Sequence, residues 1–318
     1  MSRLIEMIEA ADTIAILGHI NPDGDCVGSC LGLYNYIKEH FHKSRLTVYL
    51  QPFSSDFMFL EGADAVCHHC DSDDVYDLAI SLDCGDTGRH GEFGKYFQTA
   101  SRTICVDHHV SNQGFGDYCV VDLDASSASE AIFKLLEDNA LSTACAEALY
   151  LGIVHDTGVF KYNCTTKRTM EIAGVLLDCG ARSDYVIDQT FYKKTYLQNK
   201  LLGVALCKAE LYLKDKVIVS CLDLNDFAQS GTTKMDTDGI VDQLRITEGI
   251  ETAVFVYQQA DDQYKFSLRS NGRVNVSDIA VSLGGGGHKM AAGVSVTGAY
   301  HDILTTILEQ IEAQLALS

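Results

Sequence analysis

Short apolar runs alternate with amphipathic stretches along the first half of the chain. Four runs are rich in Val, Ile and Leu and have the length of buried strands: residues 13–18, 46–50, 77–83 and 102–106. Apolar residues recur at helical spacing over residues 2–11, 27–41 and 144–155, and Ser127-Ala128-Ser129-Glu130 fits a capping box that opens a helix through Leu136. Strands that alternate with helices predict a mostly parallel sheet with helices on both faces.

A second pattern begins at Lys216, after two further helices within 165–192 and a linking segment. Residues 196–213 carry apolar positions at helical spacing and predict a linking helix. The remaining elements are predicted as a strand at 216–221, a helix at 239–248, a hairpin of 251–258 with 263–269, a helix at 277–283, a strand at 294–296 and a helix at 300–315. The sequence therefore predicts an α/β protein with a first domain at 1–192, a linking helix at 193–214 and a smaller α/β domain at 215–318.

The composition narrows the classes of function. The 318 residues are 47% hydrophobic, which is enough for a sizeable core, and no window of about 18 apolar residues predicts a membrane helix. The formal net charge of −20 argues against a broad basic surface for long nucleic acid. Residues 1–6 lack the apolar core of a signal peptide, so we expect a cytoplasmic protein without a membrane partner.

The cysteines do not indicate a disulfide framework. Most of the 12 lie within apolar runs, where a free thiol behaves as a small hydrophobe, and a chain without a secretory signal is not expected to form disulfides. Cys67-His68-His69-Cys70 has half of a zinc-site spacing. No second pair follows at a suitable distance, so zinc is disfavoured there.

Three consecutive polar residues, Asp107-His108-His109, follow the strand predicted at 102–106. A strand that ends this way places the side chains at its carboxyl edge, where open α/β sheets hold their sites. The alternative is an ordinary polar strand end with one capping histidine. Further acids and histidines at the ends of other strands and helices favour a functional site over an ordinary strand end.

The other candidates are His19, Asp23 and Asp25 after the strand at 13–18, Asp83 after the strand at 77–83, and Asp156 after the helix at 144–155. Alone, Asp25 could be a helix N-cap, and Asp156 could belong to a surface turn. Buried together without a cation, these carboxylates would repel one another. Carboxylates and imidazoles suit divalent transition metals such as Mn²⁺, and two such ions suit displacement at phosphorus.

Residues 284–287 are four glycines, and His288 follows them. Glycine lets the backbone approach a ligand and frees N–H groups for an anion, which favours a phosphate cradle over a flexible loop. Arg269, upstream at a strand end, could add a bidentate phosphate contact. The alternative for Arg269 is a solvated surface side chain.

These motifs together resemble the DHH phosphoesterase superfamily. The resemblance rests on His19-Ile20-Asn21-Pro22-Asp23-Gly24-Asp25 with Gly28-Ser29, on Asp83, on Asp107-His108-His109 and on Asp156-Thr157-Gly158. Residues 285–293 and Ser267-Leu268-Arg269-Ser270 resemble the DHH-associated C-terminal nucleic-acid-binding domain. The chain is most similar to bacterial oligoribonucleases (nanoRNases) that also act on pAp, adenosine 3′,5′-bisphosphate.

The resemblance implies a role for each matching residue. His19 and Asp23 would bind one metal ion, Asp25, His108 and Asp156 the other, and Asp83 both. His109 would face the scissile phosphate and the leaving oxygen, and Asp107 would orient the histidines. A substrate phosphate or terminal nucleotide would be held by Arg269, Ser270, Gly285, Gly286, Gly287 and His288.

The expected activity is hydrolysis of short single-stranded RNA to mononucleotides and of pAp to AMP, with two divalent ions, most simply Mn²⁺. One alternative is a soluble phosphodiesterase acting on pApA or cyclic-di-AMP by the same chemistry. Another is a nucleotide-binding module without catalysis, which is disfavoured because every ligand position is filled. The sequence leaves the oligomeric state open, including a homodimer.

Overall fold

Two units make up the chain, and each is described by itself. The computed structural model describes residues 2–136 and 141–317, and its internal contacts separate Met1–Lys193 from Lys194–Ser318. None of the helices in these ranges is both long and apolar enough to cross a membrane.

The first unit is built on a five-stranded sheet in which every neighbouring pair is parallel. In spatial order the strands are β2 (Arg45–Tyr49), β1 (Thr13–Leu17), β3 (Leu78–Leu82), β4 (Arg102–Asp107) and β5 (Tyr118–Val121). The chain starts in β1, moves outward to β2 and returns to β3, so the strand order reverses between β1 and β3. Ligands bind beyond the carboxyl ends of strands at such reversals.

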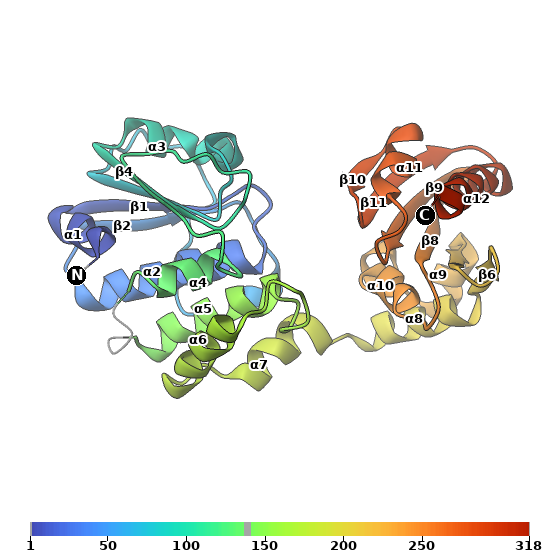
Figure 1. The fold of residues 1–318 in the computed structure, drawn as a ribbon, viewed down its shortest axis with the longest axis horizontal. Coiled ribbons are helices and arrows are strands. Elements are labelled where there is room, and N and C mark those ends of the chain that lie inside the picture. Colours follow the sequence, from blue (N-terminus) through green and yellow to red (C-terminus); the bar gives the residue numbers. More distant parts are fainter. Residues whose placement is uncertain (1, 137–140, 318) are drawn as a thin grey trace. The chain divides into compact units, whose positions relative to one another are not determined.

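Helices cover both faces of this sheet (Figure 1). Ile14 and Ile16 of β1 join a core on one face with α1 (Arg3–Ala10), α2 (Gly24–His40), α4 (Ala128–Phe133) and α5 (Thr143–Asp156). Ala15 and Leu17 point to the opposite face, where they meet α3 (Gly94–Thr99). Outside α5 lie α6 (Lys167–Asp178) and α7 (Ser183–Ile187). The predicted α/β class and parallel sheet are confirmed.

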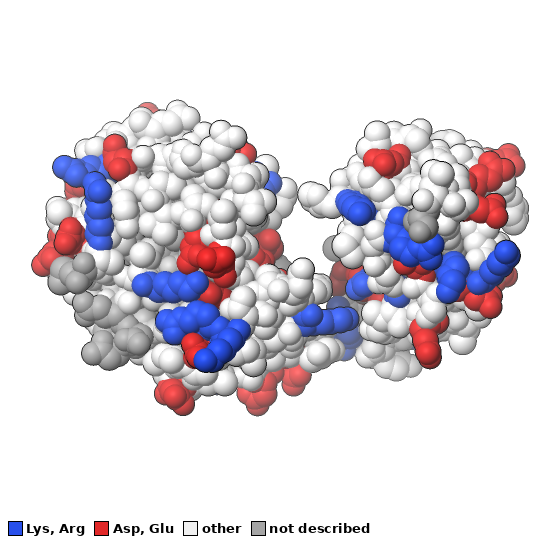
Figure 2. Space-filling view, in the orientation of Figure 1, with Lys and Arg blue, Asp and Glu red and all other residues white. Residues whose placement is uncertain are grey.

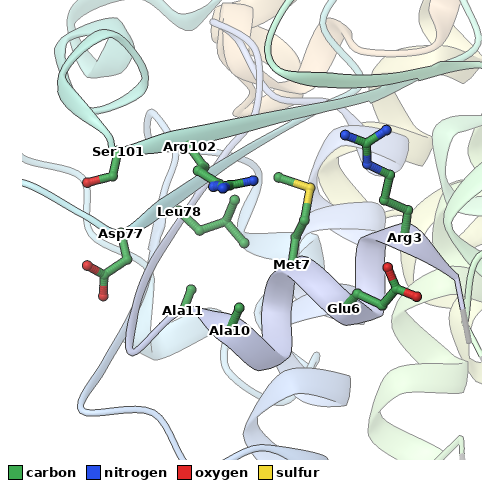
Figure 3. Close-up of a pocket in the computed structure, with 9 residues that line it drawn as sticks. All are labelled: Arg3, Glu6, Met7, Ala10, Ala11, Asp77, Leu78, Ser101 and Arg102. Atoms are coloured by element: carbon green, nitrogen blue, oxygen red, sulfur yellow. The ribbon is translucent and has the colours of Figure 1, made fainter.

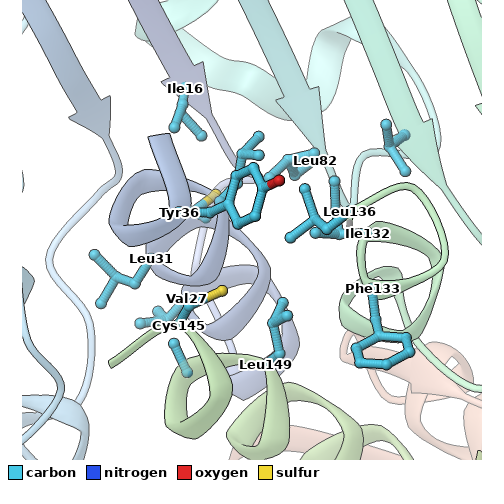
Figure 4. Close-up of a cluster of buried hydrophobic side chains, with 14 of the residues drawn as sticks. Ile16, Val27, Leu31, Tyr36, Leu82, Ile132, Phe133, Leu136, Cys145 and Leu149 are labelled. Atoms are coloured by element: carbon cyan, nitrogen blue, oxygen red, sulfur yellow. The ribbon is translucent and has the colours of Figure 1, made fainter. Parts of the chain in front are cut away.

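Close packing of α2 on α5 sets the geometry of the carboxyl edge. A Cβ at Gly28 would lie 2.5 Å from the carbonyl oxygen of Ala148, so only glycine fits there. Around this contact, side chains from α2, α4 and α5 fill the core below the sheet (Figure 4). Because α2 leaves the carboxyl edge and α5 returns to it, the start of α2 and the end of α5 meet at the same place.

The second unit has a six-stranded mixed sheet. Its strands in spatial order are β10 (Gly286–His288), β11 (Ala291–Thr297), β9 (Gln263–Ser270), β8 (Thr252–Ala260), β7 (Val217–Leu222) and β6 (Glu210–Tyr212). Only the β7–β8 pair is parallel. One face packs on α11 (Val276–Ser282) and α12 (Tyr300–Leu317), and the other on α8 (Tyr196–Cys207) and α10 (Ile240–Arg245), with α9 (Leu224–Ser230) beside α8.

The predicted linking helix is wrong in its extent. The helix ends at Cys207, and Glu210–Tyr212 form β6, which pairs antiparallel with β7. Leu201 and Ala205 of α8 are fully buried against the second sheet. This helix is therefore a packed layer of the second unit, because its apolar stripe finds a partner there.

Two smaller expectations also differ from the structure. β5 was not predicted, because its four residues are only half-buried at the sheet edge. The capping box at Ser127 forms only in part. The Ser127 hydroxyl accepts the Glu130 N–H at 3.0 Å, but the Glu130 carboxylate bonds to Ser126, and α4 ends at Phe133 rather than Leu136.

Candidate metal centre and active site

The candidate residues of the first unit meet at the strand-order reversal. His19 follows β1, Asp83 follows β3, Asp107 ends β4, and Asp25 lies in the first turn of α2. Three groups of potential ligand atoms lie within 4.8 Å of one another: His19, Cys26 and Asp83; Asp25, His108 and Asp156; and Asp83, Asp107, His108 and His109. The fold thus brings together residues that lie up to 137 positions apart, from 19 to 156.

The ring of His19 is fixed so that one nitrogen points at two carboxylates. Its Nδ1 lies 2.8 Å from the carbonyl oxygen of Ile20, which can only accept, so Nδ1 carries a hydrogen. Nε2 then faces Asp23 Oδ1 at 3.6 Å and Asp83 Oδ2 at 3.4 Å. Burial lowers the pKa of His19, but its contacts with Asp23 and Asp83 outweigh burial and raise the pKa. Fixing Nδ1 on a carbonyl is how proteins orient histidines that bind metals.

The roles of Asp23 and Asp25 differ from the N-cap alternative considered for Asp25. Asp23 is the N-cap of α2, since its Oδ1 accepts the N–H groups of Asp25 and Cys26, each at 3.1 Å. Asp25 is fully buried one residue inside the helix. The carboxylate of Asp25 therefore does not cap α2.

The start of α4 holds the Asp25 carboxylate. The Ala128 N–H donates to Oδ2 at 2.6 Å, and the Ser129 N–H donates to Oδ1 at 3.0 Å. These unpaired N–H groups at a helix start favour a negative charge. Burial, followed by repulsion from Asp83 and Asp156, nevertheless raises the pKa of Asp25. A nearby cation would relieve this repulsion.

Asp83 lies between the two groups that contain His19 and His108. Its backbone has φ +56°, a left-handed conformation that is uncommon for residues with a side chain, although Asp and Asn adopt it more often than others. Oδ2 faces His19 Nε2 at 3.4 Å, while Oδ1 faces His108 Nε2 at 3.6 Å. Oδ1 is also buried without a hydrogen-bond partner in the described part of the chain. A buried, unpartnered carboxylate oxygen between two imidazoles is the donor arrangement that a cation would satisfy.

His108 faces three carboxylates. Its Nε2 lies 3.1 Å from Asp156 Oδ2, 3.6 Å from Asp83 Oδ1 and 3.9 Å from Asp25 Oδ2. Burial lowers the pKa of His108, but the bonds to Asp156 and Asp83 outweigh it and raise the pKa to about 11. A proton on this imidazole thus supplies positive charge that the carboxylates require. Oxygen and imidazole donors in this number suit a divalent metal ion.

His109 lies at the exposed side of this cluster, with its Nδ1 3.6 Å from Asp83 Oδ1. Its Nδ1 lies 2.8 Å from Asp107 Oδ1, and nearly half of its side chain is exposed, whereas Asp107 is fully buried. The second oxygen of Asp107 accepts a hydrogen bond from the Asn112 amide at 2.7 Å. The Asp107 bond raises the pKa of His109 and leaves Nε2 directed away from the carboxylate.

Comparison with known proteins assigns a family. The DHH family, N-terminal domain, matches residues 13–153, and the DHHA1 domain matches residues 214–316. A relative from Streptococcus mutans, named a probable bifunctional oligoribonuclease and PAP phosphatase NrnA, is 32% identical over 304 residues, with 92% of each chain covered. The chain belongs to the DHH family.

Two further proteins are similar to this chain over nearly its whole length. The bifunctional oligoribonuclease and PAP phosphatase NrnA of Bacillus subtilis is 29% identical over 300 residues, with 93% of each chain covered. The crystal structure of an exopolyphosphatase-related protein from Bacteroides fragilis has a TM-score of 0.85 at 24% identity, covering 99% of this chain and 96% of that one. This last likeness shows the fold, and the predicted resemblance is confirmed.

In the DHHA1 domain, Arg269 and Ser270 end strand β9. Arg269 is partly exposed and pairs with Asp242, with Nε 3.4 Å from Oδ1. Ser270 is buried, and its hydroxyl donates to Glu251 at 3.2 Å and accepts the Gly272 N–H. The Ser270 side chain therefore supports the strand end and has no exposed hydroxyl for a substrate.

The glycine run of the DHHA1 domain is required by the packing of the backbone, in addition to the phosphate binding expected from the sequence. A Cβ at Gly285 would lie 2.4 Å from the Gly293 carbonyl oxygen, and one at Gly287 would lie 2.5 Å from that of Ala291. Gly286 pairs with Gly293 in the β10–β11 ladder. The close approach of β11 therefore requires glycine at two positions, while Gly286 and His288 remain exposed.

Two other features lie apart from the candidate centre. A cavity of about 450 Å³ opens between α1 and the amino-terminal ends of β3 and β4, at the edge of the sheet opposite Asp83 (Figure 3). The Cys67–Cys70 segment does not converge on one point. The thiols of Cys67 and Cys70 donate to the carbonyls of His69 and Glu92, and His68 Nδ1 lies 2.8 Å from the Leu50 oxygen.

Reasoning from the sequence missed the groups that support the DHH residues. The N–H donors to Asp25 come from positions 103 and 104 residues later. The Ser127 cap was a partial signal, because a helix start has free N–H groups. Asn112 carried no signal, since a polar residue in a turn after a strand is ordinary.

Proposed function

We propose that this DHH-family phosphoesterase hydrolyses short single-stranded oligoribonucleotides to mononucleotides and dephosphorylates pAp to AMP. The observation that carries the proposal is the Asp83 carboxylate, whose two oxygens face His19 Nε2 at 3.4 Å and His108 Nε2 at 3.6 Å. The substrates are those in the names of the relatives from Bacillus subtilis and Streptococcus mutans, which align with nearly the whole chain.

The donor set fits two divalent ions, most simply Mn²⁺. His19 and Asp23 would hold one, Asp25, His108 and Asp156 the other, and Asp83 would contact both. When bound, such a pair lowers the pKa of a water molecule and neutralises phosphoryl oxygens. The unpartnered Oδ1 of Asp83 and the raised pKa of Asp25 support this assignment, because both are relieved by added positive charge.

His109 would act on the leaving oxygen. With Nδ1–H donated to Asp107, the proton of the imidazolium at Nε2 is free to move to the leaving oxygen as the P–O bond breaks. The hydrogen bond to Asp107 raises the pKa of His109, which favours the protonated ring. The neutral ring then regains a proton from the water consumed in the reaction.

The second unit would supply contacts to the rest of a short substrate. Arg269, Gly285, Gly286, Gly287 and His288 are proposed to hold a phosphate or a terminal nucleotide. On the face seen in Figure 2, lysines and arginines form small groups separated by acidic and neutral surface. Together with the net charge of −20, this favours substrates with few phosphates over long nucleic acid.

A reducing compartment, and hence the cytoplasm, is the proposed location. None of the 12 cysteines, all of which lie in the described part of the chain, forms a disulfide. Disulfides are rare where glutathione and thioredoxin keep thiols reduced.

The test compares RNA of two to five nucleotides, pAp, pApA and cyclic-di-AMP side by side, with Mn²⁺ and with excess chelator. We expect hydrolysis of short RNA and pAp that requires the metal. Preference for pApA or cyclic-di-AMP would replace the proposed substrates with those of the alternative phosphodiesterase. Full activity in chelator would refute the role of metal ions, and no hydrolysis of any substrate would favour a non-catalytic nucleotide-binding protein.

A further inference from the structure

Asn112 lies three residues after His109 in the loop that follows β4. It is buried, although its neighbours Ser111 and Gln113 are exposed. A buried amide must satisfy its donors and acceptor inside the protein. The hydrogen-bond partners of the Asn112 amide therefore indicate what this side chain does.

The Asn112 amide bonds to both segments that carry candidate catalytic residues. The Nδ2 group donates to Asp107 Oδ2 at 2.7 Å and to the Cys84 carbonyl oxygen at 3.0 Å, next to Asp83, and it also contacts the Cys105 sulfur of β4 at 3.5 Å. The Oδ1 atom accepts the Gly114 N–H at 2.8 Å, and the Asn112 N–H donates to the His109 carbonyl oxygen at 3.1 Å. One side chain thus ties together the segments after β3 and β4.

We propose that Asn112 is a positioning residue that orients His109 through Asp107. Asp107 is fully buried, and its two oxygens are divided between His109 Nδ1 and Asn112 Nδ2. With Oδ2 fixed by the amide, the carboxylate cannot rotate about its own bond, so Oδ1 has one position. This sets the plane of the His109 ring and the direction of Nε2. The inference rests on the proposed function, because it assigns Asn112 a purpose in proton donation to a leaving oxygen.

Removal of the amide would leave a buried carboxylate oxygen without a donor. The Asp107 carboxylate would then turn toward other donors or admit water, and His109 would lose its fixed orientation. The loss of activity should be largest for substrates whose leaving group must receive a proton. An alkoxide, such as the sugar oxygen of a nucleotide, leaves poorly without one, whereas p-nitrophenolate is stable without a proton.

The experiment compares Asn112→Ala and Asn112→Asp with the wild type and with Gln113→Ala, a neighbouring exposed control. With an RNA dinucleotide, we expect kcat to fall roughly 10–100-fold for both Asn112 variants, a part of the gain that a general acid supplies. KM and metal content should stay near wild type. With bis-p-nitrophenyl phosphate, kcat should change less than about threefold. Asn112→Asp keeps the side-chain volume, so it serves if Asn112→Ala does not fold.

A double-mutant cycle completes the test. In a His109→Ala background, Asn112→Ala should cause no further loss on the dinucleotide, because its effect passes through His109. Equal losses on both substrates, or an added loss in the His109→Ala background, would mean that Asn112 supports the metal centre or the fold. Unchanged kcat on the dinucleotide would also overturn the proposal. Inactivity of the wild type on every phosphoester would instead refute the proposed function.

Discussion

The backbone of Asp83 is the least ordinary residue-scale feature of the centre. A left-handed φ of +56° is unfavourable for a residue with a Cβ, by about 1–2 kcal/mol. The buried carboxylate adds repulsion from its acidic neighbours. The fold keeps this position because it presents one oxygen to each of the two imidazoles.

Two replacements of Asp83 distinguish the role of its carboxylate in activity from the effect of its backbone conformation on stability. Asp83→Ala and Asp83→Gly should both lower activity by about 1000-fold or more, since each loses several kcal/mol of transition-state stabilisation. Asp83→Gly should be the more stable of the two by about 1 kcal/mol, because glycine adopts positive φ freely. Chemical denaturation in chelator measures the difference.

Activity assays with added Mn²⁺ and an Asp64→Asn control, which changes an exposed acid, complete this comparison. Retained activity in either Asp83 variant would contradict the assignment. An alanine variant as stable as the glycine variant would show that the backbone strain is negligible.

Metal binding should be linked to protons. Without a cation, the bonds to Asp156 and Asp83 overcome the effect of burial and raise the pKa of His108 to about 11, so His108 is protonated at neutral pH. Only the neutral imidazole binds a metal, so binding must release this proton, and affinity must rise as pH rises. Titration calorimetry of Mn²⁺ binding at pH 7.5 in buffers of different ionisation enthalpy should detect at least about one proton released per chain. A heat independent of the buffer would contradict this expectation.

At the scale of elements, the centre depends on how closely α5 approaches α2 and α4. A Cβ at Gly152 of α5 would lie 2.0 Å from Ser129 Oγ and 2.5 Å from Asp25 Oδ1. Ser129 belongs to the helix start that holds the Asp25 carboxylate, and Oδ1 is one oxygen of that carboxylate. Space for that carboxylate is therefore provided by a missing side chain on another helix.

Gly152→Ala should weaken both the fold and the metal site. The added methyl group overpacks the contact, which typically costs about 1–3 kcal/mol, and displaces Asp25. Gly174→Ala in α6 is the matched control, because no atom lies within 4 Å of a Cβ there. That variant should be unchanged or stabilised by up to about 1 kcal/mol. Thermal melts measure the stability of both variants, and Mn²⁺ titrations measure their metal affinity. Equal stability and equal affinity in the two variants would show that the structure around Gly152 accommodates the added methyl group without cost.

The sequence predicted elements whose signals are local. The β-branched runs located β1, β3 and β4, and polar residues at their ends predicted the group of acids and histidines that the structure brings together. The donors to Asp25 and the end of α8 depend on tertiary contacts instead. The side chain of Ser270 shows the same limit, because a match to a motif does not reveal whether a hydroxyl is buried against Glu251.

At the scale of the whole molecule, the proposed catalytic residues and the proposed binding residues belong to different units. Arg269 belongs to Lys194–Ser318, whereas the DHH residues belong to Met1–Lys193. Arg269 already pairs with Asp242, so a substrate phosphate would compete with that carboxylate. Binding of the phosphate is then favourable only because its two oxygens bond to the guanidinium more strongly than the Asp242 carboxylate does.

Arg269→Ala should lower kcat/KM for short RNA by roughly 10–150-fold, the loss expected for a charge-assisted hydrogen bond of about 1.5–3 kcal/mol. Hydrolysis of bis-p-nitrophenyl phosphate should barely change, because that diester has no second phosphate. Metal content, measured by atomic absorption, should match the wild type. Equal losses on both substrates would mean that Arg269 supports the fold, and no loss on either would remove it from the site.

The parallel sheet also determines when the centre can exist during synthesis. Its candidate ligands are spread from His19 to Asp156, and Asp156 is the last residue of α5. A nascent chain that has not yet released α5 from the ribosome lacks one ligand of the cluster that contains Asp25 and His108. Full metal occupancy therefore reports that most of the first unit has been translated and folded, and cleavage ahead of α5 leaves a fragment without the complete centre.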